Sequence, residues 1–348
     1  MKRIFRQGLC RTMTEQKKGY LKDKLMNYVV VDLEWNQPSD WKNSGDPGLC
    51  FEIIEIGAVL LDENRKQIKE FSRIIKPQVY KKMNYITRGI VNISKEELEN
   101  GEYFEDVMNE FLSWCGEDYI FCTWGPGDLV ELQRNMKYYG MPDLAKGPFP
   151  YLDVQKLYGL DFEGKKSARA LDHAVETLGI EQEAPFHRAL SDAFYTGKIL
   201  SAIRSRELLT RYSYDTYHIP KNRASEMHLT FPGYQKYISR GFMDKATAMQ
   251  DREVLSSRCI VCGKKLRKCV RNFSPGGKYY LNVARCEEDG YMKSKIRLKK
   301  TDAGKIYVVK TQKMISPDEM AEIAGRRAHI MEVKRIKESL LSRPVKKD

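Results

Sequence analysis

Short apolar runs separated by polar turns dominate the first part of the chain. Residues 28–36 (YVVVDLEWN), 51–61 (FEIIEIGAVLL) and 67–77 (QIKEFSRIIKP) are strand-length segments rich in β-branched and aromatic side chains, and the turn DENR separates the last two. Such runs, bounded by turn residues, are typical of β-strands. The pattern therefore predicts three strands in an antiparallel meander.

Helical spacing follows the meander. Within residues 95–115, apolar side chains recur every three or four positions, at Phe104, Val107, Met108, Phe111 and Leu112. The segment DYIFCTW at 118–124 predicts another buried strand. Further helices are predicted over the following ranges: 129–140, 151–159, 167–179 and 187–204.

This order of elements indicates a fold class. Three strands, then helices alternating with a strand, then a closing helix, is the order of the ribonuclease H-like α/β fold. We therefore expect residues 27–204 to form a mixed five-stranded sheet flanked by helices. A doubly wound nucleotide-binding fold is disfavoured, because no Gly-rich turn follows the first strand.

The sequence becomes more basic and aromatic, with little clear periodicity, after about residue 205, and we divide the chain there. The last part is predicted to begin a helix at Pro317, with Ser316 as its N-cap. The expected parts are a basic N-terminal arm (1–26), the α/β domain (27–204), a basic and aromatic linker (205–254), a small β-rich domain resembling a zinc ribbon (255–315), and a charged C-terminal helix and tail (316–348).

Composition and charge narrow the class of protein. The 348 residues are 42% hydrophobic and 31% charged, and no apolar run approaches the roughly 20 residues of a membrane span. Residues 1–26 lack the apolar core of a secretion signal, so we expect a soluble cytoplasmic protein without membrane contact. A transit peptide, or a leader before a start at Met26, is the alternative for that arm.

The net charge of +13 is unevenly distributed. Residues 27–204 are net negative, whereas residues 205–348 carry more than the whole positive excess. Acidic clusters bind hard cations and basic surfaces attract polyanions, which together favour metal-dependent work on nucleic acid. Solubility alone is the alternative explanation of the same charges.

Carboxylates occupy positions where burial is expected. Asp32 and Glu34 share one face of the first strand, roughly 7 Å apart, where they repel each other. Asp128 ends the strand and loop CTWGPGD, and Asp192 lies on a helix that is apolar nearly all round, just after His187. A buried carboxylate is seldom left without a cation or hydrogen-bond donors.

Four carboxylates and one histidine suit two-metal hydrolysis of a phosphodiester. Two Mg²⁺ or Mn²⁺ ions, roughly 3.5–4 Å apart, activate a water and stabilise the leaving oxygen. A neutral histidine beside them accepts the water's proton, because its pKa lies near working pH.

The sequence resembles a known family at these positions. The segments VVVDLEWN, CTWGPGD and HRALSDA resemble the three motifs of the DEDDh 3′-to-5′ exonucleases. FEIIEIGAVLLDEN, RIIKP and YITRGI resemble the branch that trims the 3′ ends of small RNAs and histone messenger RNA, although the TW before GPGD departs from that branch. The resemblance covers about residues 27–204.

The resemblance implies roles for individual residues. It implies that Asp32, Glu34, Asp128 and Asp192 hold the two ions, that Asp32 bridges them, and that His187 is the general base. It also implies that the substrate contacts Leu33, Trp35, Thr87 and Ile90, with Thr87 and Ile90 beside the terminal nucleotide. Trp35 either stacks on a base or packs in the protein.

Four of the eight cysteines cluster after residue 255. RCIVCGKKLRKC opens with the C-x-x-C-G pattern of a zinc knuckle, and RCEEDGY repeats part of it. We expect Cys259, Cys262 and Cys286 to bind zinc, with Asp289 or Cys269 as the fourth ligand. The alternative is a ribbon without metal, held together by the strands YYLNVARC, YMKSKIRLKK and KIYVVKT.

Basic residues interleaved with tyrosines in KKLRK, GGKYY and KSKIRLKK suit phosphate contacts and base stacking on a single strand. The alternative is that these basic residues form a charged face that contacts only solvent. The leading hypothesis is a metal-dependent 3′-to-5′ exonuclease acting on single-stranded nucleic acid, with RNA favoured over DNA. The alternatives are a DNA-directed proofreading or repair exonuclease and a non-catalytic nucleic-acid-binding adaptor. The sequence does not identify a protein partner.

Overall fold

The computed structural model describes residues 26–40, 45–46, 48–164 and 168–341. The chain divides into two compact units, and the boundary in the sequence lies between His218 and Ile219. The predicted N-terminal arm lies almost wholly outside the described residues. Within them, no helix combines the length and the apolar character needed to cross a membrane.

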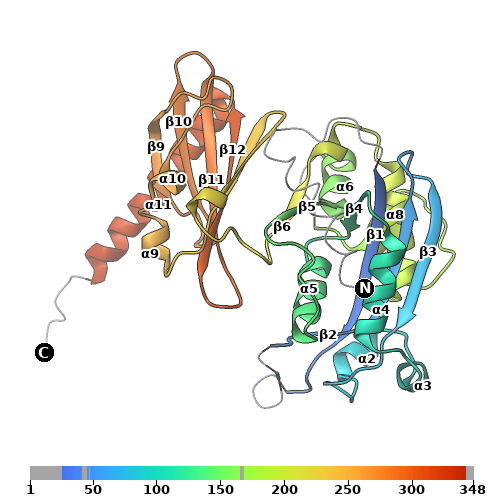
Figure 1. Cartoon of the computed structure of the whole chain (residues 1–348). Coiled ribbons are helices and arrows are strands. Elements are labelled where there is room, and N and C mark those ends of the chain that lie inside the picture. The colour runs from blue at the N-terminus through green and yellow to red at the C-terminus, as the bar shows by residue number, and fades with distance from the viewer. Residues whose placement is uncertain (1–25, 41–44, 47, 165–167, 342–348) are drawn as a thin grey trace, which may run out of the picture. The chain divides into compact units, whose positions relative to one another are not determined.

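The first unit is built on a six-stranded sheet with the strand order β3-β2-β1-β4-β5-β6. The meander β1–β3 is antiparallel, whereas β4 and β5 run parallel to β1 (Figure 1), so the predicted mixed sheet is confirmed. Its elements are β1 (Asn27–Asn36), β2 (Glu52–Leu61), β3 (Gln67–Ile74), α2 (Tyr85–Ile90), α3 (Lys95–Glu99), α4 (Phe104–Cys115), β4 (Tyr119–Thr123), α5 (Asp128–Tyr138), β5 (Phe149–Asp153), α6 (Val154–Phe162), α7 (Leu171–Thr177), α8 (Ala189–Ala202), the 3-10 turn η2 (Leu208–Thr210) and β6 (Ser213–Asp215).

Two details differ from the sequence expectation. The sheet has six strands and not five, because β6 pairs with β5 although it lies beyond residue 204. Residues 149–153 form the strand β5, where the sequence pattern predicts a helix from residue 151. The apolar run there is too short to tell a buried strand from a helix, and pairing with β4 decides for the strand.

Helices cover both faces of the first sheet. On one face, Val29, Val31 and Leu33 of β1 pack with α4 and α5. On the other face, Val30 packs with α6, α7 and α8. The alternation of side chains along β1 therefore puts Asp32 and Glu34 on the same side as α8.

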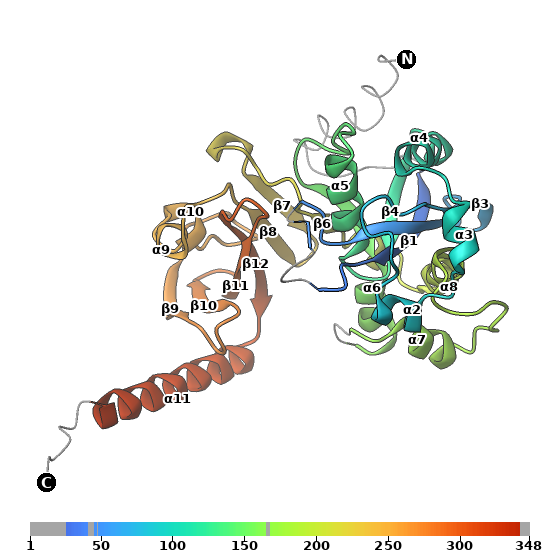
Figure 2. The same ribbon diagram turned by 90° about the horizontal axis from the view of Figure 1, so that it is seen from below.

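The second unit contains an antiparallel six-stranded sheet with the order β7-β8-β12-β11-β10-β9 (Figure 2). The strands expected for the ribbon pair as β10, β11 and β12, and β7 and β8 extend their sheet from residues expected to form a linker. The elements are the 3-10 turn η3 (Arg223–Ser225), β7 (Met227–Phe231), β8 (Tyr234–Ile238), α9 (Lys245–Ala248), α10 (Arg252–Leu255), β9 (Arg267–Phe273), β10 (Tyr280–Cys286), β11 (Gly290–Lys300), β12 (Ile306–Ile315) and α11 (Pro317–Leu341).

The C-terminal helix begins where the sequence predicts. The hydroxyl of Ser316 accepts a hydrogen bond from the Glu319 amide at 3.1 Å, and Pro317 occupies the first turn of α11. Ile323 of α11 packs on residues of β9 and β10, and so the helix covers one end of the second sheet.

Candidate active site and cysteine cluster

A close approach of α8 to the sheet builds the candidate active site. Gly57 of β2 pairs with Asp32 of β1, and a Cβ atom at Gly57 would lie 2.0 Å from the backbone nitrogen of Leu190. Only glycine leaves room for the first turn of α8 at that point. The approach puts ligand atoms of Asp32, Glu34 and Asp192 within 4.8 Å of one another.

Asp128 approaches this cluster from α5, which covers the face of the sheet opposite to α8. It is the first residue of α5, follows the loop after β4, and is 7% exposed. It does not belong to the group of three residues whose ligand atoms lie within 4.8 Å of one another. Among the neighbouring charges, however, that of Asp128 has the largest effect on the pKa of Asp32. All four predicted carboxylates are therefore electrostatically linked around Asp32.

The four carboxylates are held in an environment that disfavours their charge. Burial, with repulsion from nearby acidic groups, raises the pKa of Asp32 well above its usual range. The same causes, with burial the largest in each case, raise the pKa of Glu34 to about 8, of Asp128 to about 7 and of Asp192 to about 6. A cation bound among them would restore the charged forms.

An unpaired atom supports a cation site. Among the described residues, the buried Oδ1 of Asp192 has no hydrogen-bond partner. By contrast, the buried Glu52 accepts hydrogen bonds from the amides of Gln78, Val79 and Tyr80. Hard carboxylate oxygens, one of them buried without a donor, are the ligands that Mg²⁺ and Mn²⁺ prefer, so the residues present fit divalent ions.

His187 stands at the start of α8, before the N-cap residue Arg188. Its backbone N–H donates to Oδ2 of Asp192 at 3.3 Å, and its side chain is exposed. Its φ of 63° is uncommon for a residue other than glycine. Such backbone strain clusters at functional sites.

The four predicted substrate contacts differ in accessibility. Leu33 is 4% exposed and points into the core, away from the carboxylates, so only its backbone is available to a substrate. Trp35 is half-buried, and the centroid of its ring lies 5.5 Å from that of Phe51. One part of the ring therefore packs in the protein, and the rest is accessible to a base. On α2, Thr87 is buried and Ile90 is half exposed.

The sequence interpretation missed an ion pair that anchors α8. Glu55 of β2 is 1% exposed, and its Oε1 lies 3.1 Å from Nη2 of Arg188. Its Oε2 also accepts the backbone N–H of Ala189 at 3.1 Å. The available signal was a glutamate in the middle of the apolar run FEIIEIGAVLL. The pair fixes the first turn of the helix that carries Asp192.

Replacing Arg188 with leucine is expected to lower the free energy of unfolding by about 3 kcal/mol, because Glu55 would stay buried without its partner. Urea denaturation followed by circular dichroism measures the change. The control is Arg73→Leu, which breaks the exposed pair with Glu110 and should cost at most about 1 kcal/mol. Equal losses in both variants would contradict the anchoring role.

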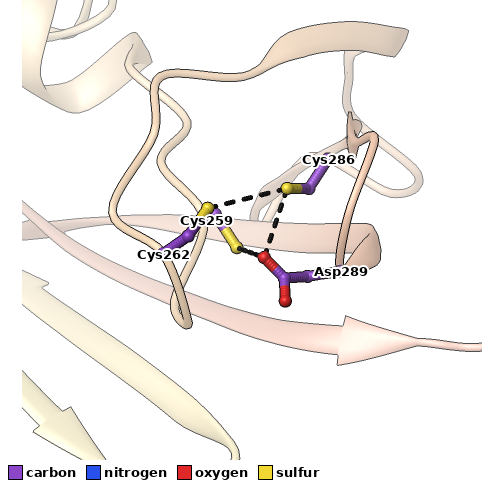
Figure 3. Close-up of side chains that lie close together, drawn as sticks. All are labelled: Cys259, Cys262, Cys286 and Asp289. Carbon is purple, nitrogen blue, oxygen red and sulfur yellow. Dashed lines mark hydrogen bonds between the residues drawn. The ribbon is translucent and has the colours of Figure 1, made fainter.

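A second cluster lies at the end of the sheet in the second unit. Cys259, Cys262, Cys286 and Asp289 each offer a ligand atom within 4.8 Å of the others, and Figure 3 shows the four side chains converging. The thiols of Cys259 and Cys286 donate to Oδ2 of Asp289, at 3.0 and 3.3 Å. The group could hold a metal ion.

The cluster also distinguishes between the two candidates for the fourth ligand. Cys269 is exposed on β9, and its Sγ contacts the carbonyl oxygen of Val283 at 3.4 Å. It does not belong to the group, whereas Asp289 does. Burial raises the pKa of Cys259 to about 12, so the thiol is neutral without a metal. Zinc binding would release these thiol protons.

Comparison with known proteins finds a family to which the first unit is similar. Residues 29–200 match the family model RNase T, described as "Exonuclease". The match covers 172 of the 348 residues, just under half of the chain, and makes this part similar to the RNase T exonucleases of DEDDh type, a family that uses divalent metals.

Named relatives align with about half of this chain. Rat "3'-5' exoribonuclease 1" is 23% identical over 184 residues, which cover 49% of this chain and 51% of that protein. "DNA polymerase III PolC-type" of Thermotoga maritima is 32% identical over 177 residues, which are 46% of this chain and 11% of the polymerase. The chain thus spans about half the length of the rat relative.

Proposed function

We propose that this chain removes nucleotides from the 3′ end of single-stranded nucleic acid by metal-dependent hydrolysis. The observation that carries the proposal is the convergence of Asp32, Glu34 and Asp192, with Asp128 beside them, in a setting that disfavours their charge. These four carboxylates would hold the two ions. Two bound Mg²⁺ or Mn²⁺ ions supply an activated water and stabilise the leaving oxygen.

The chain's own residues complete the proposed reaction. His187, held beside Asp192 by its backbone hydrogen bond, is exposed and would accept the proton of the attacking water. Thr87 and Ile90 on α2 would border the terminal nucleotide. Trp35 would contact the base through the exposed part of its ring, and Leu33 would contact the substrate through its backbone.

RNA is the favoured substrate. The rat relative named above and a Xenopus laevis protein named "ERI1 exoribonuclease 2", 24% identical over 199 residues, support it. DNA is the second candidate, since the relative with 32% identity is a DNA polymerase of the PolC type. A cytoplasmic location stays a prediction.

The test uses matched 5′-labelled single strands of RNA and DNA, incubated with Mg²⁺ or with EDTA. A ladder that shortens from the 3′ end and disappears with EDTA is expected, and the ratio of the two rates identifies the substrate. Binding of both strands with no cleavage in Mg²⁺ or Mn²⁺ would contradict the proposal and favour a non-catalytic adaptor.

We further propose that the cysteine cluster binds a structural zinc ion through Cys259, Cys262, Cys286 and Asp289. The protein purified from zinc-supplemented cells is expected to contain one zinc ion per chain, measured by mass spectrometry of the metal. Cys286→Ser should lose it, because a thiolate ligand is gone. Cys269→Ser should keep it, since that thiol lies outside the group. Loss from both variants, or no zinc in the wild type, would contradict the site.

A further inference from the structure

The helix α2 presents apolar side chains to solvent. Tyr85 is 77% exposed, and Ile86 and Ile90 are 45% and 50% exposed, whereas Thr87 is buried beneath them. Exposed apolar side chains that are grouped, and not scattered singly, mark places where a protein binds something. Ile90 is one of the two residues proposed above to border the terminal nucleotide, and a nucleobase is a flat group that such a surface suits.

The side chain of Asn36 joins the start of α2 to the first strand. Asn36 is the last residue of β1, two positions after Glu34, and is 1% exposed. Its Nδ2 donates to the carbonyl oxygens of Tyr80 and Lys82 at 2.7 and 3.0 Å, and its Oδ1 accepts the backbone N–H of Asn84 at 2.9 Å. One buried amide therefore makes three hydrogen bonds to the loop that leads into α2.

Asn84 extends the same connection. It is the N-cap residue of α2, and its Oδ1 accepts the backbone N–H of Ile86 at 2.8 Å. Its Nδ2 donates to the carbonyl oxygen of Pro38 at 2.8 Å, so the cap is itself bonded to the segment that follows β1. The first turn of α2 therefore cannot shift without breaking hydrogen bonds to the end of the strand that carries Asp32 and Glu34.

The other end of α2 is attached to the start of α8. Nη1 of Arg188 donates to the carbonyl oxygen of Asn92 at 3.3 Å, and Asn92 follows the C-cap residue Val91. The same Nη1 lies 3.5 Å from Oε1 of Glu97. The helix α2 is thus fastened at both ends to the two elements that carry three of the four carboxylates.

We propose that Asn36 is a positioning residue, which sets the place of α2 relative to the carboxylates of β1, so that α2 in turn places the base of the terminal nucleotide. This inference rests on the proposed function. Asn36 is too buried to touch the substrate, and its effect must pass through α2. A misplacement of about 1 Å can slow a reaction about 100-fold, so the hydrogen bonds that fix this distance matter for hydrolysis.

The test compares two single strands that differ only at the 3′ end, where one carries an ordinary nucleotide and the other an abasic residue. The wild type is expected to show a kcat/KM roughly tenfold higher for the ordinary strand, because only that strand has a base for α2 to contact. Asn36→Leu keeps the size of the side chain and loses its three hydrogen bonds. It should lower this ratio to about twofold and hydrolyse the abasic strand at nearly the wild-type rate.

The matched control is Asn135→Leu on α5. Asn135 is 0% exposed, and its side chain also makes three hydrogen bonds to backbone groups, those of Phe51, Ile53 and Glu131. None of these residues belongs to α2 or to its loop. The control should lose thermal stability much as Asn36→Leu does, and should keep the roughly tenfold ratio.

A milder variant keeps the test decisive if Asn36→Leu does not fold. Asn84→Ala removes the cap of α2 and the bond to Pro38, and leaves the three bonds of Asn36 in place. It should lower the ratio roughly threefold, in the same direction. A folded Asn84→Ala protein with the wild-type ratio would then overturn the proposal.

Titration with Mn²⁺ separates α2 from the metal site. The hydrogen bonds of Asn36 go to none of the four carboxylates, so Asn36→Leu should bind Mn²⁺ with the affinity of the wild type. Three results would overturn the positioning role: weaker Mn²⁺ binding by Asn36→Leu, an equal loss of rate on both strands, or a ratio that falls as far in Asn135→Leu.

Binding without hydrolysis separates this inference from the proposed function. The affinities of the two strands in EDTA, measured with the full-length protein and its variants, give the same comparison. A wild type that binds but cleaves neither strand would overturn the proposed function. The role of Asn36 would then be decided by whether Asn36→Leu loses the preference for the ordinary strand, and a wild type with no such preference in rate or affinity would overturn it.

Discussion

Replacing Asp32 with asparagine is expected to reduce hydrolysis by at least about 1,000-fold, which is about 4 kcal/mol of transition-state stabilisation. Asp32 lies at the centre of the four carboxylates, and each of the others adds to the repulsion at its side chain. The variant should therefore lose metal binding as well as turnover. Rates with Mg²⁺ and titration with Mn²⁺ measure the two effects.

The same substitution should raise the thermal stability of the metal-free protein, because folding must either protonate Asp32 or bury its charge among acidic groups, and asparagine carries neither cost. Adding Mg²⁺ should raise the melting temperature of the wild type and leave that of the variant almost unchanged. The control is Asp106→Asn, an exposed residue in the first turn of α4, which should change none of these quantities. A wild type that Mg²⁺ does not stabilise, with an Asp32→Asn variant that keeps its turnover, would remove Asp32 from the site.

Replacing Gly57 with alanine is expected to remove activity by displacing α8. The added Cβ would lie 2.0 Å from the Leu190 nitrogen and 2.1 Å from the Ala189 carbonyl carbon, and these are backbone atoms that cannot rotate away. The helix must shift, and Asp192 shifts with it. We expect a loss of about 3 kcal/mol in unfolding free energy and a larger proportional loss of turnover.

Two measurements separate misplacement from simple unfolding. Turnover of Gly57→Ala is compared with that of the wild type at a temperature where denaturation curves show both to be folded, so that a remaining loss reports the position of Asp192. The stability control is Gly89→Ala, where an added Cβ would meet nothing within 4 Å and the helix α2 gains a better helix former. An active, stable Gly57→Ala protein would contradict the close approach of α8.

Local patterns were enough to place most elements of the first unit. The strands β1, β2 and β3 and the helices α4 and α8 lie where alternation or helical spacing puts them. The failures came where pairing between distant segments decides. The short run at 149–153 becomes a strand only because β4 lies beside it, and β6 joins the sheet from a segment without clear periodicity.

The sequence by itself determined the identity of the candidate ligands. A carboxylate in an apolar strand or helix, and two cysteines before a glycine, are unusual enough to be recognised one by one, because burying them alone is costly. Each of these residue types was found without knowledge of what surrounds it.

Only the tertiary structure decided which of these residues meet. It brought Asp289 to the cysteines and left Cys269 on another strand. It also showed that Gly57 lets α8 approach β2 and that the Glu55–Arg188 pair holds the helix there. Distances between segments far apart in the chain depend on strand register and helix packing, which no local pattern encodes.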